Sequence, residues 1–454
     1  MSGPKVVRVV SREELERACE RQLAVVRSAA SDLLRTLQRH DLLTTEIESD
    51  IAGRVRSLSE LTAAGNFATV QRQAPDLILF LRRETQRQQE IAIQRAESVR
   101  AQRQKVLDAA RSVADALAKR AMPLPDELND VLRLGSRLQS GELAAARKSV
   151  DAAFRVLIDA DNSEPSASSE LARRLGRGAE HSSLSDWLAK DTLPSAQADR
   201  LPKLLAEVEV LGDTEMLDRV SVQSEQIRQE PNLDRRRLLT DSLLLEVSSL
   251  VSELKRAHAI RDRLAEVDAE LAVIPGDEAS ALRTRIATLQ GGTEGADELV
   301  ATSRELIDGT SRAAAAASRR RAVLAGLAGL GYEVKEGMET VWAEGGRLVV
   351  AKPGATDYGV ELAGPNDASR LQMRVVAAEL PAAPRTRDRD VEQENIWCHE
   401  VGELLASAAI AGTEIVIERA LPVGAQALQT TKAIGMSGDQ AIADRRTVKP
   451  RFLS

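Results

Sequence analysis

The sequence predicts a mainly α-helical protein: an elongated region of helical hairpins and coiled coil, followed by a small α+β domain with an antiparallel meander. Composition is the first reason, because 29% of the 454 residues are charged and only 2% are aromatic. Long packed helices have this composition, since aliphatic side chains fill the seams between them. The second reason is apolar periodicity, which is helical as far as Leu330 and alternates after Gly331.

The first predicted helix covers residues 11–43. Ser11 can accept a hydrogen bond as its N-cap, and Glu13 and Glu14 lie in the first turn, where the helix dipole favours acidic residues. Apolar residues recur every three or four positions along it, at Leu15, Cys19, Leu23, Val26, Ala30, Leu33 and Leu37. This spacing predicts one buried stripe. Because Cys19 lies on the stripe, we expect a buried apolar side chain rather than a reactive thiol.

Two hairpins and a long helix follow in the first half of the chain. The first hairpin turns at Gly65, because glycine suits the left-handed residue that ends a helix. The next helix reaches Ala121 and stops at residues 122–125, which include two prolines. The second hairpin turns at Gly141. Residues 162–194 begin with a stretch rich in Ser, Asn and Pro and predict a linker.

The second half repeats this order of elements. A hairpin turns at Gly212, a long helix covers residues 233–274 and ends at a proline, and a last hairpin turns at residues 291–292. Matching landmarks of the two halves lie about 150 residues apart. We therefore predict a tandem duplication of residues 50–161 and 195–310. The alternative is coincidence, since helix-rich chains share simple apolar patterns.

After Gly331, short alternating segments separated by turn residues predict strands. The predicted strands cover residues 332–335, 339–343, 347–351, 358–362, 371–377 and 414–418. A predicted helix over residues 389–411 has Trp397, Val401 and Leu404 on one face. We expect that face to pack against the meander.

These elements divide the chain into five parts. They are a first helical half (1–161), a linker (162–194), a second helical half (195–330), the α+β domain (331–425) and a flexible tail (426–454). A helix of 40 residues spans about 60 Å. It is not stable without packing, so each long helix pairs either within the chain or with a second chain in a homodimer.

No motif has the spacing that a catalytic, cofactor or metal site needs. Cys19 and Cys398 form neither a disulfide framework nor a zinc pattern. Residues 398–400 read Cys-His-Glu, but consecutive side chains on a helix point about 100° apart. The glycines within residues 326–331 follow a predicted helix, whereas a dinucleotide-binding loop precedes one. We therefore predict no catalytic, cofactor-binding or metal-binding residue, and no cofactor.

Arginine-rich stretches give a separate prediction. Both long helices carry basic residues that could follow a phosphate backbone, and the candidate contacts are Arg95, Arg100, Arg103, Arg235 and Arg236. A third basic run covers residues 319–321. Interleaved glutamates favour an ordinary solvated helix face. The net charge of −7 also argues against a general nucleic-acid binder.

The sequence predicts a cytoplasmic protein that does not bind membranes. The most membrane-like stretch, residues 322–332, has about half the length of a spanning helix. The N-terminal segment lacks the apolar run of a secretory signal. The two cysteines fit a reducing compartment.

The leading functional hypothesis is a non-enzymatic coiled-coil scaffold or adaptor that positions a protein-binding α+β domain. One alternative is a nucleic-acid-associated accessory protein that uses the arginine-rich long helices. The other is an enzyme of unknown type in the C-terminal domain. The expected partners are one or more proteins and a second copy of the chain, with nucleic acid as the partner in the first alternative.

Overall fold

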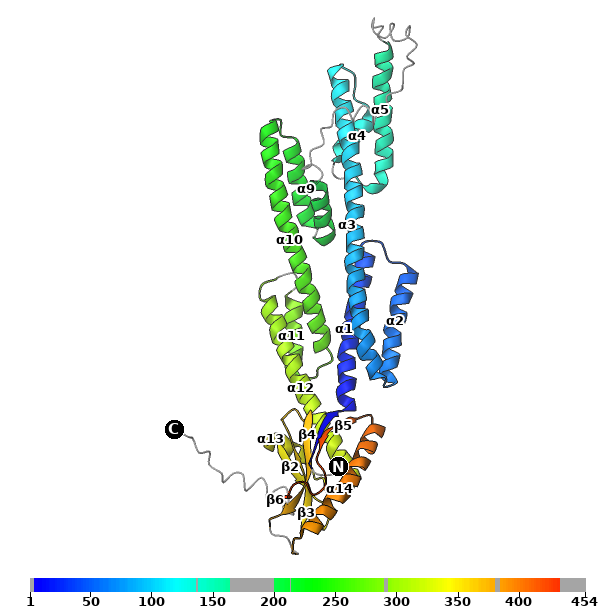
Figure 1. Ribbon diagram of the computed structural model, residues 1–454. Coiled ribbons are helices and arrows are strands. Elements are labelled where there is room, and N and C mark those ends of the chain that lie inside the picture. Colours follow the sequence, from blue (N-terminus) through cyan, green and yellow to red (C-terminus); the bar gives the residue numbers. More distant parts are fainter. Residues whose placement is uncertain are drawn as a thin grey trace, which may run out of the picture.

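The computed structural model describes residues 4–135, 138–163, 200–212, 214–289, 293–379 and 384–432. These residues form a long helical stalk that carries a small sheet domain, the head, at one end (Figure 1). The stalk has two arms. Residues 12–163 form the outgoing arm and residues 200–329 form the returning arm. The prediction of a mainly helical chain with an antiparallel sheet near its C-terminus is confirmed.

The outgoing arm contains the predicted hairpins and the first long helix. Its elements are α1 (Arg12–Arg39), α2 (Thr45–Ala63), α3 (Phe67–Lys119), α4 (Asp126–Leu134), the 3-10 turn η2 (Ser140–Glu142) and α5 (Leu143–Ser163). Ser11 caps α1 by accepting a hydrogen bond from the backbone N–H of Glu14 at 3.2 Å, as the sequence predicts. Cys19 is buried on the apolar stripe. At 53 residues, α3 is about 80 Å long.

The returning arm leads from the far end of the stalk back to the head. Its elements are α8 (Arg200–Leu211), α9 (Thr214–Arg228), α10 (Leu233–Leu271), α11 (Asp277–Thr288) and α12 (Ala296–Gly329). The predicted linker falls almost entirely on residues 164–199, outside the described residues, as do residues 291–292 of the last hairpin. Within the described ranges, no helix is both long enough and apolar enough to cross a bilayer.

Four apolar clusters stabilise the stalk, and each lies within one arm. In the outgoing arm, α3 packs against α1 and α2 near the head and against α4 and α5 near the far end. In the returning arm, α10 packs against α8 and α9 and then against α11 and α12. Both long helices thus pair within the chain, while the homodimer and the duplication stay predictions. None of these four described clusters crosses from one arm to the other.

The head is a six-stranded sheet with the order β2-β3-β4-β1-β5, and the short strand β6 pairs with the end of β4. The strands are β1 (Lys5–Val10), β2 (Arg347–Val350), β3 (Tyr358–Ala363), β4 (Arg370–Ala378), β5 (Glu414–Ala420) and β6 (Gln429–Thr431). Every pair is antiparallel except β4 with β6. The predicted helix is α14 (Arg387–Ile410), whose Trp397, Val401 and Leu404 enter the head core. Four predicted strands, 347–351, 358–362, 371–377 and 414–418, correspond to β2 to β5.

The position of β1 corrects the sequence analysis, which placed residues 5–10 in the helical half. The strand lies between β4 and β5, so Val7 faces Leu371 on one side and Ile417 on the other. Val7 and Val9 are buried in the head core. The alternation in this segment is visible in the sequence. Its pairing is not, because its partner strands lie about 360 residues or more further along the chain.

Two predicted strands in the C-terminal part are wrong. Residues 332–335 form no regular element, and residues 339–343 belong to the helix α13 (Met338–Gly345). Gly337 and Gly346, with φ of 84° and 63°, flank this helix, and they allow a short helix of 8 residues that buries Trp342. The predicted tail contains β6, and residues 433–454 lie outside the described part of the chain.

Candidate functional site

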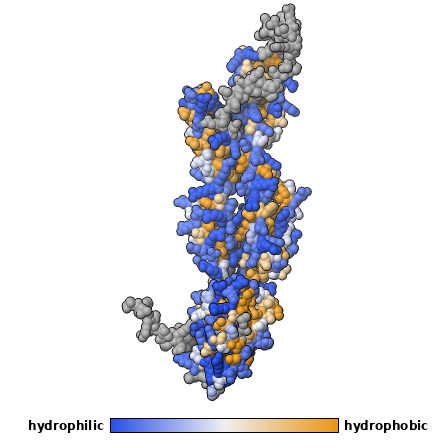
Figure 2. Space-filling view, in the orientation of Figure 1, coloured by the Kyte–Doolittle hydropathy of each residue, from blue (hydrophilic) through white to orange (hydrophobic). Residues whose placement is uncertain are grey.

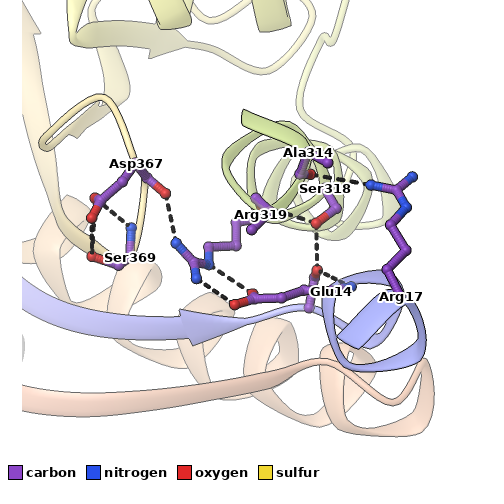
Figure 3. A network of polar contacts seen from close by, with 9 residues as sticks. Glu14, Arg17, Ala314, Ser318, Arg319, Asp367 and Ser369 are labelled. Atoms are coloured by element: carbon purple, nitrogen blue, oxygen red, sulfur yellow. Dashed lines mark hydrogen bonds and ion pairs between the residues drawn. The ribbon is translucent and has the colours of Figure 1, made fainter. Parts of the chain in front are cut away.

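The junction between head and stalk is a network of hydrogen bonds and ion pairs (Figure 3). Arg319 of α12 donates from Nε and Nη2 to the two carboxylate oxygens of Glu14 in α1, at 2.8 and 2.5 Å. Its Nη1 donates to the backbone oxygen of Asp367, in the loop between β3 and β4, at 2.8 Å. The side chains of Arg319 and Glu14 are only 14% and 22% exposed. One guanidinium therefore joins both arms to the head, with the bidentate geometry of a strong ion pair.

Neighbouring side chains extend this network. The hydroxyls of Ser11 and Ser318 lie 2.6 Å apart, so the residue that caps α1 also contacts α12. Arg320 donates to the backbone oxygen of Asn366 at 2.8 Å, and Arg321 pairs with Glu13 at 2.7 Å. The third basic run of the sequence thus contacts α1 and the loop between β3 and β4 of the chain itself.

Glycine explains how α12 approaches the head so closely. A Cβ added at Gly326 would lie 2.3 Å from Cδ1 of the buried Leu404 in α14. Val323 and Leu327 of α12 belong to the head core. Of the glycines that the sequence shows within residues 326–331, Gly326 therefore serves helix packing in this fold.

Between the arms lies an interface that we call the interarm seam. It is defined by three ion pairs that run from α3 to the returning arm: Arg82 with Glu266, Arg100 with Glu209, and Arg111 with Glu225, at 2.6, 2.7 and 2.5 Å. Arg39 adds a hydrogen bond to the backbone oxygen of Gly212 at 2.8 Å. Charged side chains thus add ion pairs to the helix contacts between two arms that each have their own apolar cores.

The structure brings three of the five predicted arginines together. Arg100 and Arg103 of α3 and Arg236 of α10 line one cavity of about 760 Å³ in the seam. Arg235 points elsewhere, is exposed and pairs with Glu230 at 3.3 Å. Arg95 is exposed on α3 and is not among the residues that line this cavity. These five residues therefore do not form one continuous basic surface.

A second cavity of about 890 Å³ lies between α1, α3, α8 and α10. It is lined mainly by polar side chains, and hollows between the arms are visible in the middle of the stalk (Figure 2). Desolvation is the main cause that raises the pKa of Asp32 here, and the ion pair with Arg35 opposes it only partly. Burial lowers the pKa of His258, whose Nε2 lies 3.1 Å from the backbone oxygen of Leu211.

His258 should make the stability of the stalk depend on pH. Burial, followed by the nearby Arg261, depresses its pKa below the ordinary value of 6.5, so the unfolded chain binds a proton at a higher pH than the folded chain. The free energy of unfolding should therefore fall as the pH drops below 6.5. In urea titrations at pH 7.5 and 5.5, we expect His258→Gln to lose less stability than the unchanged chain.

The control for this measurement is His399→Gln, because His399 is exposed on α14. This variant should keep the full loss of stability between the two pH values. An equal pH dependence in the unchanged chain and in His258→Gln would contradict the assignment.

In the head, the consecutive residues Cys398, His399 and Glu400 separate as helix geometry predicts. His399 is exposed, with Glu403 of its own helix 3.5 Å away. Glu400 is buried and accepts hydrogen bonds from the hydroxyl of Tyr332 and from Nζ of Lys352, both at 2.6 Å. Burial and the bond to Glu400 raise the pKa of Tyr332. Residues 398–400 thus do not converge on one point.

The residues that the structure singles out were largely missed from the sequence. Asp367 gave no signal, since acidic residues are abundant. Glu14 was noticed only for its place in the first turn of its helix, Glu400 only as part of the Cys-His-Glu stretch, and Arg319 only as part of a basic run. Within the described ranges, no group of three or more His, Cys, Asp and Glu side chains is placed to hold a metal ion. The chain matches no family model, and the comparisons with curated proteins and with solved structures likewise gave no match.

Proposed function

We propose that the protein is a non-enzymatic scaffold or adaptor, in which the stalk holds the head and the head binds a partner protein. The observation that carries this proposal is the double attachment of the head. Strand β1 lies inside the sheet and leads directly into α1, while the end of α12 packs into the head core. Two attachments, fixed by the Arg319 network, orient the head more firmly than one flexible linker would.

The surface of the head supports the part of the proposal that concerns a partner. Ile396 and Ile410 of α14 and Val416 and Ile417 of β5 are all exposed, and apolar areas are visible on the head in Figure 2. Large exposed apolar side chains are found in protein interaction sites, where they form patches. Glu414 and Glu418 flank the apolar pair on β5, and charges on an edge strand discourage unselective sheet pairing.

Two features favour this proposal over the alternatives. Arg100, one of the arginines that a nucleic-acid contact would use, already forms an ion pair with Glu209. The residues of the Cys-His-Glu stretch point in different directions, which gives no support to an enzyme built on them. Nucleic-acid binding and catalysis in the head stay as alternatives for experiment.

Affinity capture with the full chain as bait tests the adaptor proposal. The variant Ile410→Asp places a charge on the apolar surface of the head, where the side chain is 89% exposed, so the fold should be unaffected. We expect proteins captured by the unchanged chain to be reduced at least tenfold with this bait, because a buried charge at an interface costs more than about 1.4 kcal/mol. Quantitative mass spectrometry measures the ratio.

The matched control is Leu238→Asp on α10, an apolar side chain of the stalk that is 71% exposed. Equal capture by both variants and by the unchanged chain would count against the head as the binding part. A bait that ends at residue 330 is unsuitable for this purpose. It would leave β1 without its partner strands and would expose the end of α12.

A further inference from the structure

The cavity of about 760 Å³ in the interarm seam has walls from both arms. Helix α3 forms one wall, and α8, α9 and α10 of the returning arm form the others. In Figure 1, α9 lies beside the upper part of α10, in the half of the stalk that is far from the head. Leu107, Leu205 and Leu243 supply apolar surface, and the hydroxyls of Ser221 and Ser224 supply polar groups. This volume lies in the range of small-molecule sites.

Most of the carboxylates around this cavity already have basic partners. Glu209 pairs with Arg100 at 2.7 Å. Glu225 pairs with Arg111 at 2.5 Å and with Arg228 at 3.1 Å. Asp108 accepts hydrogen bonds from Gln104 and has Arg111 3.7 Å away. Asp218 is the lining carboxylate for which no ion pair occurs within the described residues, and it is exposed.

Two arginines at the cavity form no ion pair with a carboxylate within the described residues, and they come from opposite arms. Nε of Arg103 on α3 is buried and has no hydrogen-bond partner among the described residues. Arg236 on α10 is half-buried, and no carboxylate in the described ranges pairs with it. Burial lowers the pKa of Arg103 and the neighbouring Arg100 lowers it further, while the carboxylate of Glu209 opposes these effects only partly. A negative charge in the cavity would relieve both the burial of this cation and its repulsion from Arg100.

We propose that this cavity binds a small anion with phosphate groups, which contacts Arg103 and Arg236 and so links the two arms. The planar guanidinium group matches the oxygens of a phosphate, and such charge-assisted hydrogen bonds are about twice as strong as neutral ones. The hydroxyls of Ser221 and Ser224 supply additional donors. None of the four apolar clusters of the described stalk crosses between the arms, so a ligand that contacts both arms would strengthen their association directly.

Isothermal titration calorimetry of the full chain with pyrophosphate, at constant ionic strength, tests the proposal. We expect one site per chain, and at least about tenfold weaker binding in Arg103→Gln and in Arg236→Gln, since each loses a charge-assisted contact. The matched control is Arg235→Gln. It removes the adjacent arginine, which is exposed and pairs with Glu230, and it should change the affinity less than about twofold.

A spectroscopic measurement separates loss of binding from loss of folding. Spin labels on α3 and α10 report the distance between the arms, and pyrophosphate should narrow the distance distribution in the unchanged chain but not in Arg103→Gln. Absence of pyrophosphate binding would overturn the proposal. So would an equal loss of affinity in Arg235→Gln.

Single-stranded DNA of 12 nucleotides distinguishes a free phosphate compound from the backbone of a nucleic acid. Competition between this DNA and pyrophosphate for the same site would keep the proposal and identify a nucleic acid as the source of the phosphate. DNA binding without pyrophosphate binding, weakened equally by Arg95→Gln and Arg235→Gln, would overturn it in favour of an extended basic surface.

Discussion

The variant Val7→Asp is expected to unfold the head while both arms of the stalk stay folded. Val7 is completely buried on β1, an interior strand of the sheet, and lies between Leu371 of β4 and Ile417 of β5. An aspartate there would place an unpaired carboxylate in an apolar core, which costs about 4 kcal/mol or more. The arms have separate apolar clusters, so this loss should not spread to α3 or α10.

Hydrogen exchange measured by mass spectrometry resolves this effect by region. The backbone amides of β4, β5 and α14 should lose their protection from exchange, and those of the stalk should keep it. The control is Arg8→Ser on the same strand, because Arg8 is exposed and forms only an exposed ion pair with Glu414, worth less than about 1 kcal/mol. If the backbone amides of the sheet stayed fully protected from exchange in both variants, the position of β1 inside the sheet would be wrong.

The variant Arg319→Gln is expected to loosen the head from the stalk without unfolding either part. The change removes a bidentate, largely buried ion pair with Glu14 and the hydrogen bond to the backbone oxygen of Asp367. Removal of one partner from a buried ion pair costs about 3–5 kcal/mol, and partial exposure of this pair reduces that to about 2–3 kcal/mol. Pulsed dipolar spectroscopy between labels on α14 and α10 should show a broader distance distribution.

The adjacent Arg321 gives the matched control for this prediction. Its ion pair with Glu13 is about half exposed, so Arg321→Gln should cost less than about 1 kcal/mol and leave the distance distribution narrow. A double-mutant cycle of Arg319→Gln with Glu14→Gln should give a coupling free energy of about 2 kcal/mol. Coupling near zero would mean that the network does not determine the orientation of the head.

Local patterns were sufficient to predict the stalk. The cap at Ser11, the stripe through Cys19 and the proline stop near Pro123 are all encoded within a few residues of the helix ends that they define. Helices depend on contacts three and four residues apart, so periodicity alone locates them. The same reasoning placed the long helix α10 within a few residues of its observed ends.

The head was harder to predict because its contacts join residues that are far apart in the sequence. Nothing close to Val7 indicates a pairing with Leu371, and segment 339–343 contains residues that suit either a strand or a helix. In the structure this segment is a helix, and its Trp342 packs against the head core, which the local pattern does not specify. Tertiary packing of this kind overrides local propensity.

The candidate sites show the same limit. The sequence revealed where arginines are frequent but not which carboxylates they meet. Arg100 pairs with Glu209, about 110 residues away, while Arg103 beside it lacks a partner among the described residues. Residues three positions apart on one helix thus differ in charge environment because of contacts from the other arm.

The position of β1 between β4 and β5 has a consequence for the synthesis of the chain. Lys5 to Val10 leave the ribosome about 400 residues before their neighbour β5. At 5–20 residues per second, this strand waits roughly 20–80 s before its sheet can close, while both arms can fold as they emerge. During that interval an apolar strand with unpaired backbone groups is exposed on every nascent chain. We therefore expect a chaperone that binds nascent chains to occupy residues 5–10 until the last strands arrive.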